Sequence, residues 1–360
     1  MKKLLIILLI FAIALLLRPH KNVSHAYANS SYVVVEESSG RVLMGENEKF
    51  SLPMASTTKI MTALVVLDNC QPDEMVKIHP KAVGIEGSSI YLRANEEYSV
   101  LELLYGLMLR SGNDSAVALA IHVGGCVENF VTMMNAKSQQ LGLKNTNFTN
   151  PHGLHHSDHY TSAYDLAMIT REAFRHDIFA KIVATKCYQR TDGSYFYNKN
   201  KMLSLIEGGD GVKTGYTTKS GRCLVSSATR DGMRLICVVL NHYDMWHDSV
   251  NMLNKCFEDY SLVDLKSIIP LDKLQVNNAK IPFVDISIED NVIYPLGSDE
   301  IDKISYSIEL SNVSAPLKKG EKVGNIKIFL DNCLLFSKNL CTIDNVEKKN
   351  IFDIIKENLS

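Results

Sequence analysis

The sequence predicts an α+β fold, in which helices pack on an antiparallel sheet and form a helical subdomain, followed by a small all-β module. Strand-like segments open and close the region 29–263, helical patterns fill its middle, and short alternating segments dominate 275–345. Helices grouped between two runs of strands are typical of α+β domains whose first and last strands share a sheet. A signal peptide over 1–28 and a short amphipathic tail over 346–360 complete the predicted division of the chain.

The first 28 residues have the layout of a secretory signal peptide. Lys2 and Lys3 form a positively charged start, an apolar run follows over 4–17, and residues 26–28 match an A-x-A cleavage site. The apolar run is short for a membrane span. An uncleaved N-terminal anchor is the alternative, because the segment between the apolar run and the cleavage site is long. Both interpretations predict an exported chain, in the cell wall or at the outer face of the cytoplasmic membrane.

Charge and cysteine usage restrict the classes of function. The 360 residues carry a formal net charge of −2, and removal of 1–28, which holds four basic and no acidic residues, brings it to −6. A mildly acidic exported chain lacks the basic face that nucleic acids require, so we expect no nucleic-acid partner.

The eight cysteines are scattered without a C-x-x-C pair. They are predicted to be mostly small buried hydrophobes, with one or two disulfides as the alternative.

Each element of the first domain follows from its periodicity and its turns. Alternation over 31–48, with a turn at Ser38-Ser39-Gly40, predicts a β-hairpin. Apolar residues spaced i, i+3, i+4, i+7 from Ile60 to Leu67 predict a helix after Pro53. β-rich runs on both sides of Asp231-Gly232 predict a second hairpin, because Asp-Gly favours two-residue hairpin turns. Further helices are expected over 100–123, 130–140, 162–174 and 245–260.

The all-β module is predicted from short alternating segments such as "VDISI", "ISYSIEL" and "VGNIKIFL", separated by Pro, Gly, Asn and Asp. Its boundary with the first domain is expected near 262–274. In the tail, Ile351, Ile354, Ile355 and Leu359 fall on one side of a helix. Docking on the module, or fraying, is one interpretation of this helix, and peripheral contact with a membrane surface is the other.

Three short motifs carry the chemistry. Ser56-x-x-Lys59 stands at a predicted helix start, Ser111-Gly112-Asn113 at a turn between helices, and Lys213-Thr214-Gly215 on a strand near the end of the domain. Ser-x-x-Lys alone means little, because serine is a common N-cap and about one or two matches are expected by chance. In this order and these settings, the three motifs are typical of serine acyl-transfer enzymes that act on peptidoglycan and β-lactams.

Elementary chemistry explains the first motif. A serine hydroxyl is a weak nucleophile at neutral pH and needs a base within hydrogen-bond reach. At positions i and i+3 of a helix, Ser56 and Lys59 project from the same face. Lys59 must be partly neutral to accept a proton, which requires burial or a nearby positive charge that Lys213 could supply. The N-terminal end of the helix also favours the negative charge that develops at Ser56.

The chain resembles the D-alanyl-D-alanine carboxypeptidases, which are low-molecular-mass penicillin-binding proteins. The resemblance covers essentially the whole exported chain and rests on "ASTTKIMTA", "SGNDSA", "NPHGL" followed by "TSAYDLA", "VKTGYTTKSGRCLVSSA" and "APLKKGEKVGNIKIFLDN". It implies a β-lactamase/DD-peptidase-like domain over 29–263 and a serine carboxypeptidase activity without metal or cofactor. Peptidoglycan stem peptides ending in D-Ala-D-Ala would be the substrates, and β-lactams would be covalent inhibitors.

The resemblance also implies a role for each matched residue. Ser56 would be the nucleophile, Lys59 its base, and Ser111 the relay of a proton to the leaving D-alanine. The substrate-binding residues would be Asn113, Lys213, Thr214, Gly215 and Tyr216.

Within this set, Lys213 and Thr214 would bind the terminal carboxylate, and Gly215 would let the peptide lie against its strand. The backbone N–H groups of Ser56 and Tyr216 would form the oxyanion hole. Tyr216 departs from the family pattern, in which many members have histidine directly after Lys-Thr-Gly. That change leaves the backbone donor in place and replaces the side chain that those members offer for substrate selection and deacylation.

Three competing hypotheses stay open on sequence alone. A β-lactamase would need a base for deacylation, a Glu in class A enzymes, and no such candidate is clear between Asn113 and Lys213. A non-catalytic peptidoglycan-binding or β-lactam-sensing protein would keep the fold without turnover. The histidine-rich loop 152–159 suggests a zinc hydrolase, but it lacks the helical H-E-x-x-H spacing.

Overall fold

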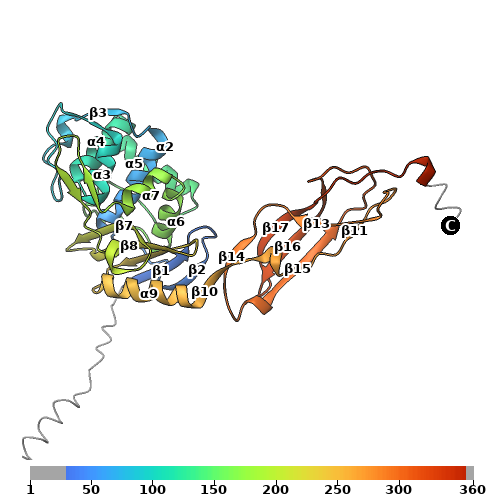
Figure 1. The fold of residues 1–360 in the computed structure, drawn as a ribbon. Coiled ribbons are helices and arrows are strands. Elements are labelled where there is room, and N and C mark those ends of the chain that lie inside the picture. Colours follow the sequence, from blue (N-terminus) through green and yellow to red (C-terminus); the bar gives the residue numbers. More distant parts are fainter. Residues whose placement is uncertain (1–29, 354–360) are drawn as a thin grey trace, which may run out of the picture.

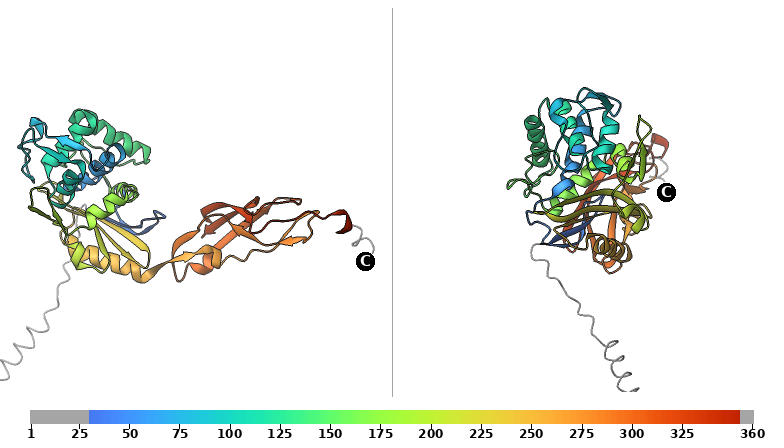
Figure 2. Two further views of the ribbon diagram at one scale, coloured as in Figure 1. Left: turned by 45° about the horizontal axis from the view of Figure 1, so that its top comes forward. Right: turned by 90° about the vertical axis from the view of Figure 1, so that its left-hand side faces the viewer.

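The computed structural model describes residues 30–353 (Figure 1). The predicted signal peptide and the last part of the predicted tail, 354–360, lie outside the described residues. The chain forms two parts that lie end to end, a larger part of helices on a sheet and an elongated β part (Figures 1 and 2). This arrangement confirms the predicted fold class, an α+β domain followed by an all-β module.

A five-stranded antiparallel sheet forms the base of the first part, in the order β2-β1-β9-β8-β7. The first hairpin and the last three strands therefore share one sheet, as predicted. Asp231 and Gly232 connect two of these strands, as their hairpin signal indicates. The strands are β1 (Ser31–Glu36), β2 (Val42–Glu46), β7 (Gly209–Thr217), β8 (Gly221–Arg230) and β9 (Met233–Leu240). β7 is an edge strand, so one side of its backbone has no strand partner among the described residues.

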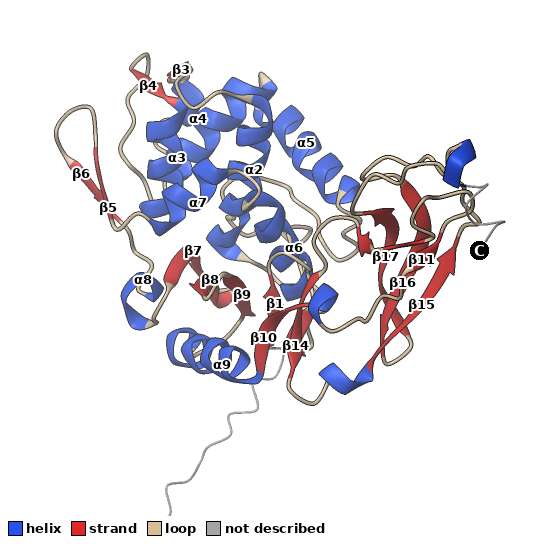
Figure 3. Ribbon diagram, turned by 45° about the vertical axis from the view of Figure 1, so that its right-hand side comes forward, coloured by secondary structure: helices blue, strands red, loops and turns tan. Residues whose placement is uncertain are grey.

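Helices cover both faces of this sheet (Figure 3). Val33 and Val35 of β1 belong to the apolar core beneath the helical subdomain, whereas Val34 belongs to the core beneath α9. This alternation is the two-residue period of a strand buried on both faces. Helices α8 (Met202–Leu205) and α9 (Met245–Asp259) cover one face. The subdomain on the other face consists of α2 (Lys59–Asn69), α3 (Val100–Leu109), α4 (Asn113–Gly124), α5 (Val127–Gln140), α6 (Ala163–Ala173) and α7 (Asp177–Ala184).

The helical stretch expected over 100–123 consists of two helices, α3 and α4, separated by the predicted turn. Within residues 30–353, no single helix is long and apolar enough to span a membrane. α4 and α5 have the required length and apolarity only when they are taken as a pair, and the pair is bent by 85° at the break between them. Short elements fill the remaining connections: the 3-10 helices η1 (Ala55–Thr58) and η2 (Pro80–Ala82), and the hairpins β3 (Met75–Lys77) with β4 (Glu97–Ser99) and β5 (Cys187–Gln189) with β6 (Tyr195–Tyr197).

The second part is built on a four-stranded antiparallel sheet in the order β13-β17-β16-β15 around its own apolar core. β10 (Tyr260–Asp264) pairs with β14 (Ile293–Gly297), so this part starts directly after α9 and includes residue 263, the predicted end of the first domain. The other elements are β11 (Leu274–Gln275), β12 (Phe283–Val284), β13 (Ile286–Ile288), β15 (Ile304–Leu310), β16 (Lys322–Leu330), β17 (Cys333–Thr342) and the 3-10 helices η3 (Leu265–Ser267) and η4 (Ile301–Lys303).

Arg41, between β1 and β2, joins the two parts. Its guanidinium forms two hydrogen bonds with the carboxylate of Glu300 and donates another to the carbonyl of Pro295. It also lies 5.3 Å from the ring centroids of both Tyr260 and Tyr294. The guanidinium is therefore held by a carboxylate, a backbone carbonyl and two aromatic faces of the second part.

Candidate active site

The three sequence motifs converge between the helical subdomain and the open edge of the sheet. Ser56 lies in η1, and Lys59 is the first residue of α2. Asn113 begins α4, and η1 packs against β7, which carries the third motif. Residues that are far apart in the sequence therefore meet because two helices start, and one edge strand passes, at the same place.

Lys59 is the centre of a hydrogen-bond network. Its Nζ lies 3.0 Å from Ser56 Oγ, 2.6 Å from Asn113 Oδ1 and 2.7 Å from the carbonyl oxygen of His152. The amide and carbonyl oxygens only accept hydrogen bonds. A neutral amine would donate to these two and keep its lone pair for the proton of Ser56. The geometry thus fits a serine activated by a lysine base.

The surroundings of Lys59 favour its neutral form. The side chain is completely buried, and this burial lowers its pKa well below the usual value, with the nearby charges of Lys213 and Lys199 adding to the shift. Asp114 opposes the shift to a lesser degree, because its negative charge favours the ammonium. The sequence predicts that Lys59 needs either burial or a neighbouring cation to be partly neutral, and the structure provides both.

Lys213 is the second buried lysine of the site. Only 2 % of it is exposed, and its Nζ donates a hydrogen bond to the carbonyl of Thr214 over 2.9 Å. Burial, with a contribution from Lys199, lowers its pKa to about 7. A carboxylate arriving here would gain the attraction of Lys213 and would in turn stabilise its charged form.

Gly215 allows β7 to approach η1 closely. A Cβ atom at this position would lie 3.0 Å from the carbonyl oxygen of Met54 and 3.1 Å from the backbone nitrogen of Ser56. These separations are tighter than ordinary side-chain contacts. The absence of a side chain therefore brings the backbone of β7 next to the N–H of Ser56. Tyr216, the following residue, is 66 % exposed.

Two residues of the site have left-handed backbone angles. Ala55, directly before Ser56, has φ of 48°, and Ser111 has φ of 65°. Such angles are uncommon for residues other than glycine and cluster at functional sites, where surrounding contacts maintain them. Ser111 is also buried, at 5 % exposure, two residues before the start of α4.

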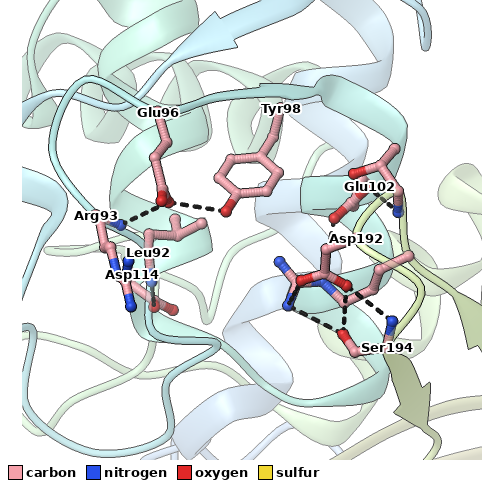
Figure 4. Close-up of polar contacts among 10 residues, drawn as sticks. Leu92, Arg93, Glu96, Tyr98, Glu102, Asp114, Asp192 and Ser194 are labelled. Carbon is pink, nitrogen blue, oxygen red and sulfur yellow. Dashed lines mark hydrogen bonds and ion pairs between the residues drawn. The ribbon is translucent and has the colours of Figure 1, made fainter.

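Asp114 follows Asn113 and holds the loop 86–92 in place. The sequence analysis did not identify this residue. Its buried carboxylate accepts hydrogen bonds from the backbone N–H of Ile90 and Leu92 and from the hydroxyl of Ser89. Figure 4 shows Asp114 at this loop, near the separate contacts of Glu96 with Tyr98. An Asp directly after Ser-Gly-Asn, in the first turn of a helix, was a signal that could have found it.

The loop that passes under Asn113 contributes a further contact. The Nδ2 of Asn113 donates to the carbonyl of Glu86, and its backbone N–H donates to the carbonyl of Ser88. Both functional groups of the Asn113 amide are therefore used, Oδ1 by Lys59 and Nδ2 by this loop. Asp114 and Asn113 together hold the loop 86–92 next to Lys59.

Two residues of the histidine-rich loop 152–159 contact residues of the site. His152 supplies its backbone carbonyl to Lys59. The ring of His159 lies 2.7 Å from the hydroxyl of Thr58 and accepts a hydrogen bond from the backbone of Thr149. Burial lowers the pKa of His152 to about 4 and that of His159 to about 3, so both rings are neutral near pH 7.

Comparison with known proteins gives two family matches that together span most of the chain. Residues 19–244 match the family described as D-alanyl-D-alanine carboxypeptidase. Residues 257–348 match the C-terminal domain of penicillin-binding protein 5. The interval between the two matches, 245–256, lies within α9.

Individual relatives extend this likeness over nearly the full length. D-alanyl-D-alanine carboxypeptidase DacF of Bacillus subtilis is 32 % identical over 349 residues, which cover 93 % of this chain and 90 % of the relative. DacC of Escherichia coli is 30 % identical, covering 89 % and 85 %. The crystal structure of penicillin-binding protein 5 from Haemophilus influenzae matches with a TM-score of 0.71 at 32 % identity, covering 88 % of this chain and 97 % of that one.

The likeness therefore spans both parts of the molecule. A sequence identity of 30–32 % over this length reflects common descent. The residues that carry the motifs lie inside the larger match. The chain belongs to the D-alanyl-D-alanine carboxypeptidase family.

Proposed function

We propose that the chain is a serine D-alanyl-D-alanine carboxypeptidase that removes the terminal D-alanine from peptidoglycan pentapeptide through an acyl-enzyme on Ser56. The observation that carries the proposal is the contact of Ser56 Oγ with a buried lysine amine, 3.0 Å away, whose pKa is lowered well below its usual value. Membership of the family supports the same activity. β-Lactams would acylate the same serine and act as inhibitors.

The first half-reaction would form the ester. Ser56 Oγ attacks the carbonyl carbon of the penultimate D-alanine, and its proton passes to Lys59 Nζ. The backbone N–H groups of Ser56 and Tyr216 would stabilise the negative charge on the carbonyl oxygen. The C–N bond then breaks, and the leaving amine takes up the proton through Ser111. Terminal D-alanine departs, and the remaining peptide is an ester of Ser56.

The second half-reaction would return the free enzyme. A water molecule gives a proton to Lys59 and attacks the ester carbonyl, and Ser56 regains a proton as the C–O bond breaks. The products are the shortened peptide with a new carboxylate and the original serine. A penicilloyl ester at Ser56 is expected to survive much longer, because no clear glutamate base for its deacylation occurs in the sequence between Asn113 and Lys213.

Substrate would be held along the open edge of β7. A peptide backbone can add to an edge strand through main-chain hydrogen bonds. The second hydrogen of Asn113 Nδ2, which does not point to Glu86, would be donated to the substrate backbone, while Lys213 and Thr214 would hold the terminal carboxylate. The close approach permitted by Gly215 places this edge next to the N–H of Ser56.

Intact-mass spectrometry after incubation with benzylpenicillin tests the nucleophile. One stable adduct is expected on the protein, absent from Ser56→Ala and retained in Ser204→Ala, a control at an exposed serine of α8. Release of D-alanine from a D-Ala-D-Ala peptide is then expected from the unmodified protein and not from Ser56→Ala. No adduct with intact drug would favour a non-catalytic binding protein, and consumption of the drug without an adduct would favour a β-lactamase.

We also propose that the chain acts outside the cytoplasm, where its substrate lies. The apolar run over 4–17 and the A-x-A site at 26–28 support export. The apolar side of the tail supports a peripheral contact with the membrane. Fractionation of cells that produce the full chain tests export, and recovery of the protein in the cytoplasm would contradict it. The same fractionation with a chain that lacks residues 346–360 tests the tail. Equal recovery of the two chains with the membrane would contradict a role of the tail in membrane contact.

A further inference from the structure

Three metal-ligating side chains meet at the far ends of the two helices that begin at the active site. Cys70 directly follows α2, which starts at Lys59. His122 is in the last turn of α4, which starts at Asn113. At 1.5 Å per residue, both lie about 15 Å along their helices from the catalytic groups. Glu74, in the loop after α2, completes the group. None of the three belongs to a motif that the proposed reaction uses.

We propose that Cys70, Glu74 and His122 form a Zn²⁺ site outside the active site. Thiolate, carboxylate and imidazole are the three donor types that zinc uses in proteins. One donor atom from each residue lies within 4.8 Å of the other two. The mixture of a soft sulfur ligand with imidazole favours zinc over magnesium or calcium, which take oxygen ligands.

The separations fit tetrahedral coordination after a small movement. Zn–S bonds of about 2.3 Å and Zn–N or Zn–O bonds of about 2.0–2.2 Å place ligand atoms about 3.3–3.6 Å apart. His122 Nε2 and Glu74 Oε2 are already 3.5 Å apart. Cys70 has to approach by at most about 1 Å, which rotation of a side chain can supply.

The backbone around the three ligands is well anchored. The N–H of Cys70 bonds to the carbonyl of Val66 at the end of α2. The carbonyl of Glu74 accepts from the N–H of Val100, the first residue of α3. The second carboxylate oxygen of Glu74 accepts from the N–H of Gln71, leaving Oε2 to face His122. Hydrogen bonds that orient a ligand in this way are common around metal sites.

The charges of the group also favour a cation. The carboxylate of Glu74 brings a negative charge to the group, next to the ring of His122. A divalent ion bound by the three side chains would hold the Cys70 sulfur as thiolate. Glu74 and His122 are 42 % and 26 % exposed, so solvent can reach the fourth coordination position. The ion would tie the loop after α2 to the end of α4 and shield an otherwise free thiol from oxidation.

Titration of the metal-depleted, reduced full chain with Co²⁺, followed by displacement with Zn²⁺, tests the site. We expect one equivalent to bind, with a thiolate-to-metal charge-transfer band in the near ultraviolet that Zn²⁺ abolishes. Zn²⁺ should also raise the Tm, because it binds the folded state. Cys70→Ser should lose the band. His122→Gln should weaken binding by about 100-fold or more, since even changes in the groups around metal ligands cost about 10–100-fold.

Cys187→Ser is the matched control, because this cysteine is exposed on β5, away from the group. It should bind Co²⁺ and Zn²⁺ like the unmodified chain. Absence of the band in the unmodified chain, or its survival in Cys70→Ser, would overturn the proposal. Penicillin labelling of each variant reports whether it has folded. If Cys70→Ser fails to label, Glu74→Gln and His122→Gln decide the question, and unchanged binding in both would equally overturn it.

Discussion

The amine of Lys59 lies 2.6 Å from the side-chain oxygen of Asn113, so the proposed base is held by a neutral acceptor from the start of another helix. A neutral partner lets Lys59 lose its proton, whereas a carboxylate in the same place would favour the charged form. The amide of Asn113 thus orients Lys59 without raising its pKa. Among residues with side chains of this shape, only asparagine meets both requirements.

Replacement of Asn113 by Asp tests this balance. The carboxylate should raise the pKa of Lys59, so that the rising limb of the pH profile for acylation by benzylpenicillin moves to higher pH. At pH 7 the acylation rate should fall by up to about tenfold for each unit by which the pKa rises. Acylation rates measured by stopped flow across a range of pH locate this rising limb. Asn129→Asp, on α5, is the control and should leave it in place. An unchanged limb in Asn113→Asp would show that Asn113 does not act on Lys59.

Lys213 predicts a falling limb in the pH profile of peptide cleavage. Burial, aided by Lys199, lowers its pKa to about 7, so that above this pH the free enzyme loses the positive charge expected to attract the terminal carboxylate. kcat/KM for a D-Ala-D-Ala peptide should therefore fall as pH rises beyond about 7, because this ratio reports the free enzyme.

Lys213→Arg separates this cause from others. Arginine stays charged throughout the accessible range, so any activity that the variant retains should lack the falling limb. A limb at the same pH in Lys213→Arg would assign it to another group. Lys319→Arg, at an exposed position of the second part, should show the limb of the unmodified protein.

Gly215→Ala should reduce activity more than stability. The added methyl group would press on the carbonyl of Met54 and the nitrogen of Ser56, displacing β7 from η1 by a few tenths of an ångström. Misplacement of reacting groups by about 1 Å can cost about 100-fold in rate, so for this smaller displacement we expect kcat/KM to fall by up to about 10-fold. Gly45→Ala on β2, where a Cβ would make ordinary contacts, is the control. Full activity in Gly215→Ala would show that close approach is not required.

Asp114→Ala should destabilise the first part of the molecule. It would remove the acceptor of two backbone N–H groups and one hydroxyl, and unsatisfied buried donors cost about 1–3 kcal/mol each in context. We expect the free energy of unfolding to fall by about 2–4 kcal/mol in urea titrations. Asp73→Ala, at an exposed acidic residue, should change it by less than about 0.5 kcal/mol. A fall in Asp114→Ala no larger than that would show that the loop 86–92 does not depend on this carboxylate.

The sequence predicted those features that depend on local periodicity and turn chemistry. Asp231-Gly232 defined its hairpin because few dipeptides adopt that turn so readily. The convergence of Ser56, Asn113 and Lys213 could be inferred because their three motifs, in this order, rarely occur together by chance. Both cases rest on information carried by a few neighbouring residues.

Other features depend on contacts between distant segments, which periodicity does not encode. β10 pairs with β14 across an intervening loop and short strands, and composition does not encode this pairing. The carbonyl of His152 reaches Lys59 through the backbone, and any residue type could have supplied it. The left-handed angle of Ser111 is likewise a property of the fold and not of serine.

The open edge of β7 has a consequence for solubility. An unpaired strand edge can recruit the same strand of a second molecule, and proteins counter this with charged side chains that point inward from the edge. Lys213 is a basic residue buried within the edge strand itself, and it is charged below its pKa of about 7. The residue proposed to recognise the substrate would therefore also act as a gatekeeper against edge-to-edge aggregation, and replacing it with an apolar residue should make the protein self-associate as well as lose activity.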